Sequence, residues 1–360
     1  MRITQLRVDA LRNLRAVELQ PGPGINLFTG ANGAGKTSLL EAVYLLSHGR
    51  SFRSGSREVL VREGGGTPVL YAEVFWNGGS LRRLGLTREG RAWRGRVDGS
   101  DVDTLATLLR GIVVVCFEPG SHALISGPSE ERRSFLDWTL FHVEPRYLDI
   151  ARRYRRALKQ RNVLLRSSAA PDLLTPWDLE LASVGTQLTA WREAFVRHWA
   201  ERLARETAQL IGELGAPVVE FESGWDRSLD LAEALERNRG HDLERGHTRV
   251  GPHRADWAIW FPAAPRREYL SRGQEKACAL ACVLAQAAML REALGESPVV
   301  CLDDLASELD RAHQAQVVSR LVADESQVWI TGTDDLSALA DHASRVTRFH
   351  VEQGQVVTLL

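Results

Sequence analysis

The sequence predicts an α/β fold built on a parallel sheet, with an antiparallel sheet beside it and an inserted helical segment. Three observations support this prediction. A buried strand runs into a glycine-rich loop before a helix, strand-like runs are separated by hairpin signals, and a long central stretch has helical periodicity. The chain has 360 residues, enough for two or three domain-sized units or for one lobe with an insertion.

Strand patterns dominate the N-terminal part. Alternating apolar residues predict paired strands at 2–8 and 16–20, and the apolar run 25–29 predicts a buried strand before the glycine loop. A helix is expected to begin at Lys36 and to run through Ser47. Further strand-like runs follow, interrupted by hairpin signals at Asn77-Gly78-Gly79 and Glu89-Gly90, at 69–76, 80–86 and 92–97. These runs predict the antiparallel sheet.

The middle of the chain predicts a helical insertion. The period becomes helical from Pro128, and proline is favoured in the first turn of a helix. Long amphipathic patterns cover 144–166 and 176–214 and are separated by a break that ends at Pro171, so we expect an antiparallel helical hairpin. The predicted domains are residues 1–120 and 245–360 for the α/β core with its β subdomain, and residues 121–244 for the inserted helical lobe.

The C-terminal part predicts the rest of the parallel sheet. After Gly251 the pattern becomes strand-like again. Helices and strands then alternate, which is typical of a parallel sheet, with an apolar helix at 274–294, a buried strand at 299–302, a helix at 311–322 and a strand at 327–331.

Composition excludes several classes of protein. With 44% apolar and 25% charged residues and a net charge of −1, the chain is typical of globular proteins and has no overall attraction for polyanions, so nucleic-acid binding must be local. The longest apolar run, 277–290, is shorter than the ~20 residues of a membrane-spanning helix, and the start shows no signal sequence. We expect no membrane association and a cytoplasmic location. The four cysteines lie in apolar stretches and are interpreted as reduced core residues: Cys116, Cys278, Cys282 and Cys301.

The glycine-rich loop predicts an ATP site. It fits the pattern G-x-x-x-x-G-K-[ST] and comprises Gly30, Ala31, Asn32, Gly33, Ala34, Gly35, Lys36 and Thr37. The glycines allow successive backbone N–H groups to face phosphate oxygens at a helix N-terminus. Lys36 is expected to reach the β and γ phosphates, and the Thr37 hydroxyl is expected to bind Mg²⁺.

Two aspartates follow the apolar strand 299–302 and complete the predicted site. We expect Asp303 to hold Mg²⁺ from the end of the strand, and Asp304 to orient or deprotonate the attacking water. The predicted catalytic residues are therefore Lys36, Asp303 and Asp304. The alternative interpretation is that the aspartates only cap the helix after a core strand.

A third motif lies between the loop and the aspartates. The run Leu270-Ser271-Arg272-Gly273-Gln274 resembles the signature sequence of the ABC ATPase superfamily, and 307–310 lies where that superfamily has its D-loop. The resemblance implies that Ser271, Arg272, Gly273 and Gln274 act in trans, capping the γ phosphate held by a second copy, so that ATP induces a homodimer. The alternative is that Ser271 is simply a helix N-cap.

Departures from the ABC pattern predict a slow ATPase. Arg272 replaces the usual glycine, Asp304 stands for the commoner and longer glutamate, and the stretch 331–334 lacks the histidine that many ABC transporters carry. These departures favour a switch over a motor. Because the loop, signature and carboxylates also occur in transporters, the ATPase subunit of a membrane transporter is the alternative function, and a small-molecule kinase is a weaker one.

Over nearly its whole length the chain resembles the RecF family, in the SMC branch of the ABC ATPases. The motifs that match lie at 11–15, 49–53, 127–133, 251–254 and 270–274, with Asn32 in the loop. The resemblance implies an ABC-type ATPase head, ATP-dependent dimerisation on DNA, action at single-strand gaps and stalled replication forks, and partnership with RecR, RecO and recombinase. Ala255 stands where the family usually has an acidic residue.

A basic stripe on the first hairpin helix is the candidate DNA contact. Arg152, Arg155, Arg156 and Lys159 fall at i, i+3, i+4 and i+7, with Arg153 and Arg161 beside them. Such a stripe would neutralise phosphates without reading sequence. The alternative is a solvated face, or ion pairs with Glu131, Glu193 or Asp178. Arg53 and Arg254 are further candidate phosphate or DNA contacts, and the alternative is that they are surface or structural arginines.

Overall fold

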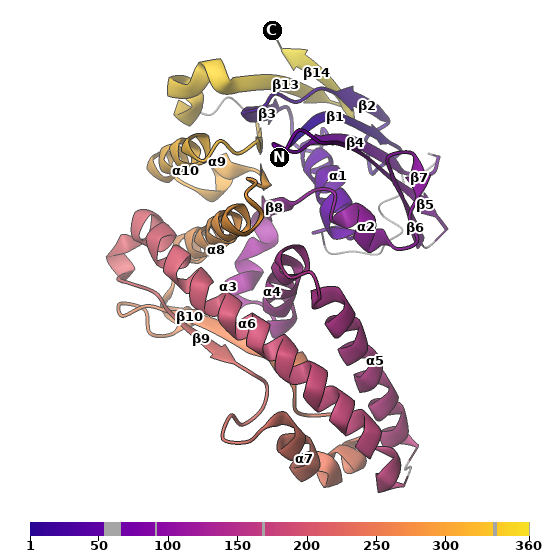
Figure 1. Ribbon diagram of the computed structural model, residues 1–360. Coiled ribbons are helices and arrows are strands. Elements are labelled where there is room, and N and C mark those ends of the chain that lie inside the picture. Colours follow the sequence, from indigo (N-terminus) through magenta and orange to yellow (C-terminus); the bar gives the residue numbers. More distant parts are fainter. Residues whose placement is uncertain (54–65, 91, 168–169, 334–336, 360) are drawn as a thin grey trace. The chain divides into compact units, whose positions relative to one another are not determined.

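The computed structural model describes residues 1–53, 66–90, 92–167, 170–333 and 337–359. These residues form two compact units, one made of residues 1–122 and 271–360 and the other of residues 123–270. The chain thus leaves the first unit and later returns to it, which is the topology of an insertion (Figure 1). The predicted α/β fold with an antiparallel sheet and a helical insertion is confirmed.

A six-stranded antiparallel sheet belongs to the first unit. In spatial order its strands are β2 (Ala16–Leu19), β1 (Arg2–Asp9), β4 (Val69–Phe75), β5 (Leu81–Glu89), β6 (Ala92–Val97) and β7 (Ser100–Asp101). Burial alternates along β1 and β4, so one face of each strand packs into the core. The predicted turn at 77–79 connects β4 to β5, where the Gly79 N–H donates to the Trp76 carbonyl at 2.8 Å.

The second sheet of this unit is mainly parallel and positions the predicted site. Its order is β14 (Gln355–Leu359), β13 (Val346–Glu352), β3 (Ile25–Thr29), β12 (Val328–Gly332), β11 (Val299–Leu302) and β8 (Val114–Phe117). Every residue of β11 and β12 is buried, which is typical of parallel strands covered on both faces. In its core the Phe28 ring stacks between Trp329 and Phe349, with ring centroids 5.1 and 4.8 Å away.

The described part of the first unit contains the three predicted helices, which begin at Lys36, Arg272 and Arg311, and two short helices that the sequence pattern did not predict. They are α1 (Lys36–His48), α2 (Leu105–Leu109), α8 (Arg272–Leu294), α9 (Leu305–Glu308) and α10 (Arg311–Ala323). Among the described residues, one helix, α8, is long and apolar enough to cross a membrane, but 72% of its most apolar stretch is buried inside the protein. The expectation of a buried core helix there is confirmed.

The second unit contains the predicted helical hairpin. Helix α5 (Tyr147–Arg166) and helix α6 (Thr175–Leu210) lie side by side (Figure 1). Helix α5 begins three residues later than the pattern predicts because Pro145 lies in the turn before it. The other elements of the unit are α3 (Ala123–Ser126), α4 (Ser129–Val143), β9 (Val218–Glu222), α7 (Leu231–Arg245) and β10 (Asp256–Trp260).

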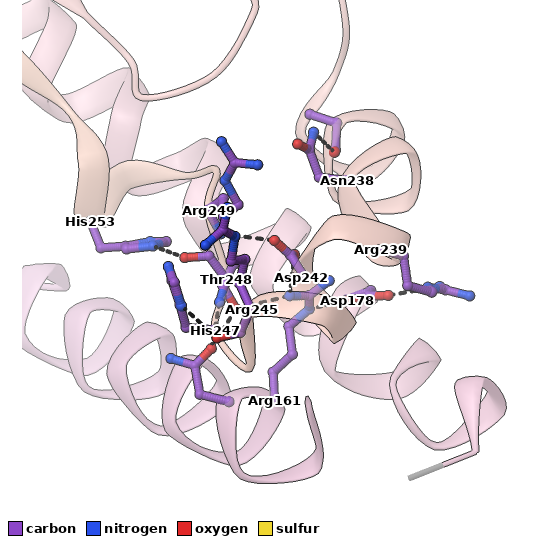
Figure 2. A network of polar contacts seen from close by, with 12 residues as sticks. Arg161, Asp178, Asn238, Arg239, Asp242, Arg245, His247, Thr248, Arg249 and His253 are labelled. Carbon is purple, nitrogen blue, oxygen red and sulfur yellow. Dashed lines mark hydrogen bonds and ion pairs between the residues drawn. The ribbon is translucent and has the colours of Figure 1, made fainter. Parts of the chain in front are cut away.

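A buried ionic network joins α7 to the hairpin. Arg161 of α5 is fully buried and donates from Nε to Asp178 Oδ1 at 2.5 Å and from Nη1 to Asp242 Oδ2 at 2.6 Å. Its Nη1 also donates to Thr248 Oγ1 at 2.9 Å, and Arg239 Nη2 donates to Asp178 Oδ2 at 2.7 Å. Figure 2 shows these groups converging from three helices and the loop after α7. The network fixes α7 against α5 and α6, because each buried charge depends on a partner from another element.

The chain beyond Arg245 differs from the predicted domain limits. The sequence pattern assigns residues 245–270 to the α/β core, but they pack within the second unit. Strand β10 pairs antiparallel with β9, and Arg132 of α4 binds the Asp256 carboxylate through two nitrogens at 2.7 and 2.8 Å. These pairings connect segments far apart in sequence, so local patterns could not reveal them.

Candidate functional site

The glycine loop lies between β3 and α1, at the carboxyl end of the parallel strand. Gly30 has a φ of +150°, and a Cβ there would lie 2.1 Å from the Val351 carbonyl oxygen, so only glycine fits. Gly33 has a φ of +79°, and no heavy atom lies within 4 Å of the place a Cβ would take. The loop is therefore closed against the sheet and open on the side that phosphates would approach, so its residues fit ATP.

Lys36 places its ammonium group inside the curve of this loop. The residue is 9% exposed, and Nζ donates to the carbonyls of Gly30 at 2.7 Å and Ala31 at 3.0 Å. These carbonyls hold the amine at the centre of the loop, within reach of anionic oxygens bound there. The remaining predicted loop residues, Asn32, Ala34 and Gly35, lie on the same turn, with Asn32 exposed and the other two buried.

Asp303 meets the loop through Thr37. Asp303 Oδ1 accepts from Thr37 Oγ1 at 2.9 Å and from Thr331 Oγ1 at 2.7 Å, although residues 37 and 303 are far apart in the chain. Burial raises the pKa of the Asp303 carboxyl, and the hydrogen bonds from both hydroxyls oppose this rise. A hydroxyl and a carboxylate side by side at the end of a strand are hard oxygen ligands, so the pair fits Mg²⁺.

Asp304 adopts a backbone conformation that is unusual for its residue type. Its φ is +52° and its ψ is +43°, in the left-handed region, and its N–H donates to Thr331 Oγ1 at 2.8 Å. Such a conformation costs on the order of 1 kcal/mol or more and is often found at functional sites. Thr331 thus orders both aspartates, a role that its side chain alone did not reveal in the sequence.

Residues of the motif at 11–15 contact the glycine loop and the start of α1. Asn13 Nδ2 donates to the Gly33 carbonyl at 2.8 Å, and Ser38 Oγ donates to Asn13 Oδ1 at 3.1 Å. Arg12 Nε and Nη2 donate to the two carboxylate oxygens of the fully buried Glu41 at 2.8 and 2.7 Å. The sequence indicated this motif only through the family resemblance, because its contacts depend on tertiary structure.

Glu118 is a third carboxylate beside the aspartates, and the sequence did not identify it. It follows β8, which pairs with β11, and the Asp303 N–H donates to the neighbouring Phe117 carbonyl at 2.8 Å. Burial raises the pKa of Glu118, the charges of Asp303 and Glu308 raise it further, and a hydrogen bond from the Gly120 N–H lowers it. The sequence signal that could have identified Glu118 is its position directly after the apolar strand β8, like that of Asp303 after β11.

The signature residues form the exposed start of α8. Ser271 is the N-cap: its Oγ accepts from the Gln274 N–H at 3.2 Å, and its N–H donates to Gln274 Oε1 at 3.0 Å. This capping box is the arrangement that the simpler interpretation expects. Ser271, Arg272 and Gly273 are nevertheless exposed, so their groups can also face a second molecule.

The predicted basic stripe lies on the exposed face of α5. Arg152, Arg155, Arg156 and Lys159 are all exposed there. Arg153 binds Glu180 through Nε at 2.8 Å and Nη2 at 3.0 Å, so its charge is partly neutralised. The placement of Arg161 beside the stripe is wrong, because this residue is fully buried and pairs with Asp178 and Asp242.

Several arginines of the other family motifs have structural partners. Arg132 pairs with Asp256, and Arg133 Nη1 donates to the Ala255 carbonyl at 2.8 Å. Arg254 is exposed within the second unit. Arg53 is exposed in the first unit, where its charge lowers the pKa of Asp303. Of the stretch 331–334, which lacks the histidine that many ABC transporters carry, residue 334 lies outside the described residues.

Comparisons with known proteins find a matching family model, similar sequences and similar solved structures. Residues 5–66 match a family model described as an AAA domain. A DNA replication and repair protein RecF from Stenotrophomonas maltophilia (strain R551-3) is 48% identical over 364 aligned residues, which cover 100% of both chains. A solved structure of the recombination mediator protein RecF with ATP, in the RecFOR pathway, has a TM-score of 0.90 and 26% identity, covering 99% of this chain and 97% of that one.

A more distant likeness concerns the fold alone. An SmcHead crystal structure, bound to the C-winged helix domain of ScpA, has a TM-score of 0.58 at 15% identity and covers 100% of this chain and 98% of that one. The chain therefore shares its fold with this SmcHead, and this fold agrees with the ABC-type ATPase head predicted from the signature and the glycine loop.

Proposed function

Because the chain belongs to the RecF family of DNA replication and repair proteins, we propose that it is an ATP-controlled DNA-binding protein of recombinational repair. In this proposal it dimerises on binding ATP, holds DNA at single-strand gaps and stalled forks, and helps to load recombinase together with RecR and RecO. Slow ATP hydrolysis resets it. Since it would bind cellular DNA and hydrolyse ATP, we propose that it acts in the cytoplasm.

One contact supports the ATP switch most strongly, the hydrogen bond between Thr37 and Asp303. It joins the two halves of a nucleotide site that are separated by most of the chain. Lys36 would bind the β and γ phosphates, and Thr37 and Asp303 would hold Mg²⁺, which neutralises phosphate charge when bound. Asp304 would orient the attacking water, and its side chain is one methylene shorter than glutamate, which favours slow hydrolysis.

The signature supports an ATP-dependent homodimer. Ser271, Arg272, Gly273 and Gln274 present a helix N-terminus to solvent, and such an end binds anions. If it faces the triphosphate of a second copy, two-fold symmetry completes two equivalent sites and closes the assembly as a dimer. ATP in the loop of one chain would then be held by both chains.

The basic stripe on α5 supports sequence-independent DNA binding. Arg152, Arg155, Arg156 and Lys159 place four positive charges on one exposed helix face of a chain whose net charge is −1. Contacts of this kind bind phosphates and release counterions, so affinity falls steeply with salt.

Sedimentation velocity and binding to gapped DNA, each with and without ATP and Mg²⁺, test the switch. We expect the mass to double and the DNA affinity to rise with ATP in the wild type, and neither change in Lys36→Ala. Unchanged mass and unchanged DNA affinity in the wild type would rule out the switch.

A charge variant tests the DNA surface separately. Replacing both Arg152 and Arg156 by Gln should weaken binding to all sequences alike and lower the salt slope by about 2, because roughly one unit is lost with each phosphate contact. Replacing both Arg197 and Arg205 by Gln, at exposed positions of α6, removes the same charge and is the matched control. Equal effects of the stripe variant and the control would exclude α5 as the DNA contact.

A further inference from the structure

Lys276 and Glu308 form an ion pair between two segments of the first unit. Lys276 Nζ lies 2.9 Å from Glu308 Oε2, and the side chains are 34% and 8% exposed. A carboxylate this buried loses most of its hydration, so it depends on the cation that contacts it. Glu308 is therefore held in place more firmly than an acid in a surface ion pair, which samples many conformations.

Lys276 belongs to the start of α8. It lies in the first turns of the helix, close to the capping box that Ser271 and Gln274 form. A helix is nearly rigid over one turn, so fixing Lys276 fixes the direction in which the first N–H groups of α8 point. These are the groups that would meet the nucleotide of a second copy.

Glu308 belongs to the segment 303–308, which carries Asp303 and Asp304 and is called the carboxylate loop below. It is the last residue of the short helix α9, whose N-cap is Asp304. The Asp304 N–H donates to Thr331 Oγ1 at 2.8 Å, and Thr331 Oγ1 donates to Asp303 Oδ1 at 2.7 Å. A continuous set of contacts thus leads from the magnesium-type oxygens to Glu308, and Lys276 extends it to the signature helix.

We propose that Lys276 and Glu308 are positioning residues that hold the start of α8 in register with the chain's own carboxylate loop. This inference rests on the ATP-dependent dimer proposed above, and the partner is a second copy of this chain with bound ATP. Each chain contributes its loop to one triphosphate and the start of α8 to the other. The pair therefore sets the spacing between the two triphosphates that one chain contacts. Neither residue touches nucleotide.

Three variants test the pair: Lys276→Gln, Lys276→Arg and the charge exchange Lys276→Glu with Glu308→Lys. Nucleotide affinity of the monomer is measured by titration with ATP, dimerisation by sedimentation velocity, and order at 271–276 by amide hydrogen exchange of the monomer. Arg82→Gln, which removes the same charge from an exposed position of β5, is the control.

We expect Lys276→Gln to bind ATP within twofold of the wild type, to need at least tenfold more protein to dimerise, and to exchange its amide hydrogens faster at 271–276. Lys276→Arg should restore dimerisation, and the charge exchange should restore it in part.

The outcomes separate this inference from the proposed function. If the wild type dimerises with ATP and Lys276→Gln dimerises equally well, the positioning role is overturned while the switch stands. If the wild type stays monomeric with ATP, the switch itself fails. Unchanged hydrogen exchange at 271–276 in the Lys276→Gln monomer also overturns the positioning role, whatever the state of assembly.

Discussion

Replacing Arg161 by Met is the sharpest test of what holds the second unit together. The change removes a fully buried guanidinium that binds Asp178, Asp242 and Thr248. Asp178 keeps Arg239 at 2.7 Å, whereas the partner that remains among the described residues for the side chain of Asp242, which is 0% exposed, is the Arg249 N–H at 3.1 Å. Breaking one partner of a buried ion pair costs about 3–5 kcal/mol, because an uncompensated charge remains. Since one acid keeps a cation, we expect about 3–4 kcal/mol here.

Urea unfolding followed by tryptophan fluorescence measures this loss, since Trp199 and Trp257 are buried in the second unit. The melting temperature of the second unit should fall by about 10 °C, at roughly 2–4 °C per kcal/mol for a unit of about 150 residues. Arg156→Met, at an exposed position of the same helix, is the control and should change stability by less than about 0.5 kcal/mol.

A second substitution separates the ion pair from the packing of the side chain. Adding Asp242→Leu to Arg161→Met removes the orphaned carboxylate, so the double variant should be more stable than Arg161→Met alone. If Arg161→Met loses no more stability than Arg156→Met, the buried ion pairs do not hold this unit together. The same conclusion follows if Asp242→Leu lowers the stability of the double variant by its full single-variant cost.

Four further predictions concern the loop, the carboxylate and one histidine. Lys36→Ala should abolish ATP binding, as measured by equilibrium titration, because the amine that faces the phosphates is gone. Asp303→Asn should slow ATP hydrolysis in a steady-state assay while ATP-induced dimers persist in sedimentation; dimers that never form would contradict these roles. Gly30→Ala should lose ATP affinity and stability together, since its Cβ would meet the Val351 carbonyl oxygen at 2.1 Å. Burial lowers the pKa of His253 from 6.5 to about 4, so the unfolded state binds the proton more readily than the folded state between these pH values. The stability that His253 contributes is therefore complete above pH 6.5 and is lost as the pH falls towards 4, by up to about 3 kcal/mol. His253→Gln should flatten the pH dependence of unfolding over this range, and a wild-type slope in the variant would exclude His253 as its source.

Local sequence patterns predicted the fold class, which is confirmed, and a nucleotide site. The motif 30–37, the aspartates after an apolar strand and the signature each combine a fixed spacing with a local element, so neighbouring residues suffice to recognise them. The hairpin helices were predicted for the same reason, because helical periodicity is a property of consecutive residues. The site roles that rest on these patterns remain predictions, whereas the limits of the inserted unit differ from the predicted ones.

Which charged groups are buried and which segments contact one another depends on the tertiary structure. In the sequence, Arg161 cannot be distinguished from the other basic residues of α5. It is nevertheless fully buried, because α6 and α7 supply Asp178 and Asp242 from other parts of the chain. In the same way, the ion pair of Lys276 with Glu308 depends on how α8 packs against the carboxylate loop. Local patterns report the periodicity of one segment, whereas burial and charge pairing depend on its neighbours in space, which no short stretch of sequence specifies.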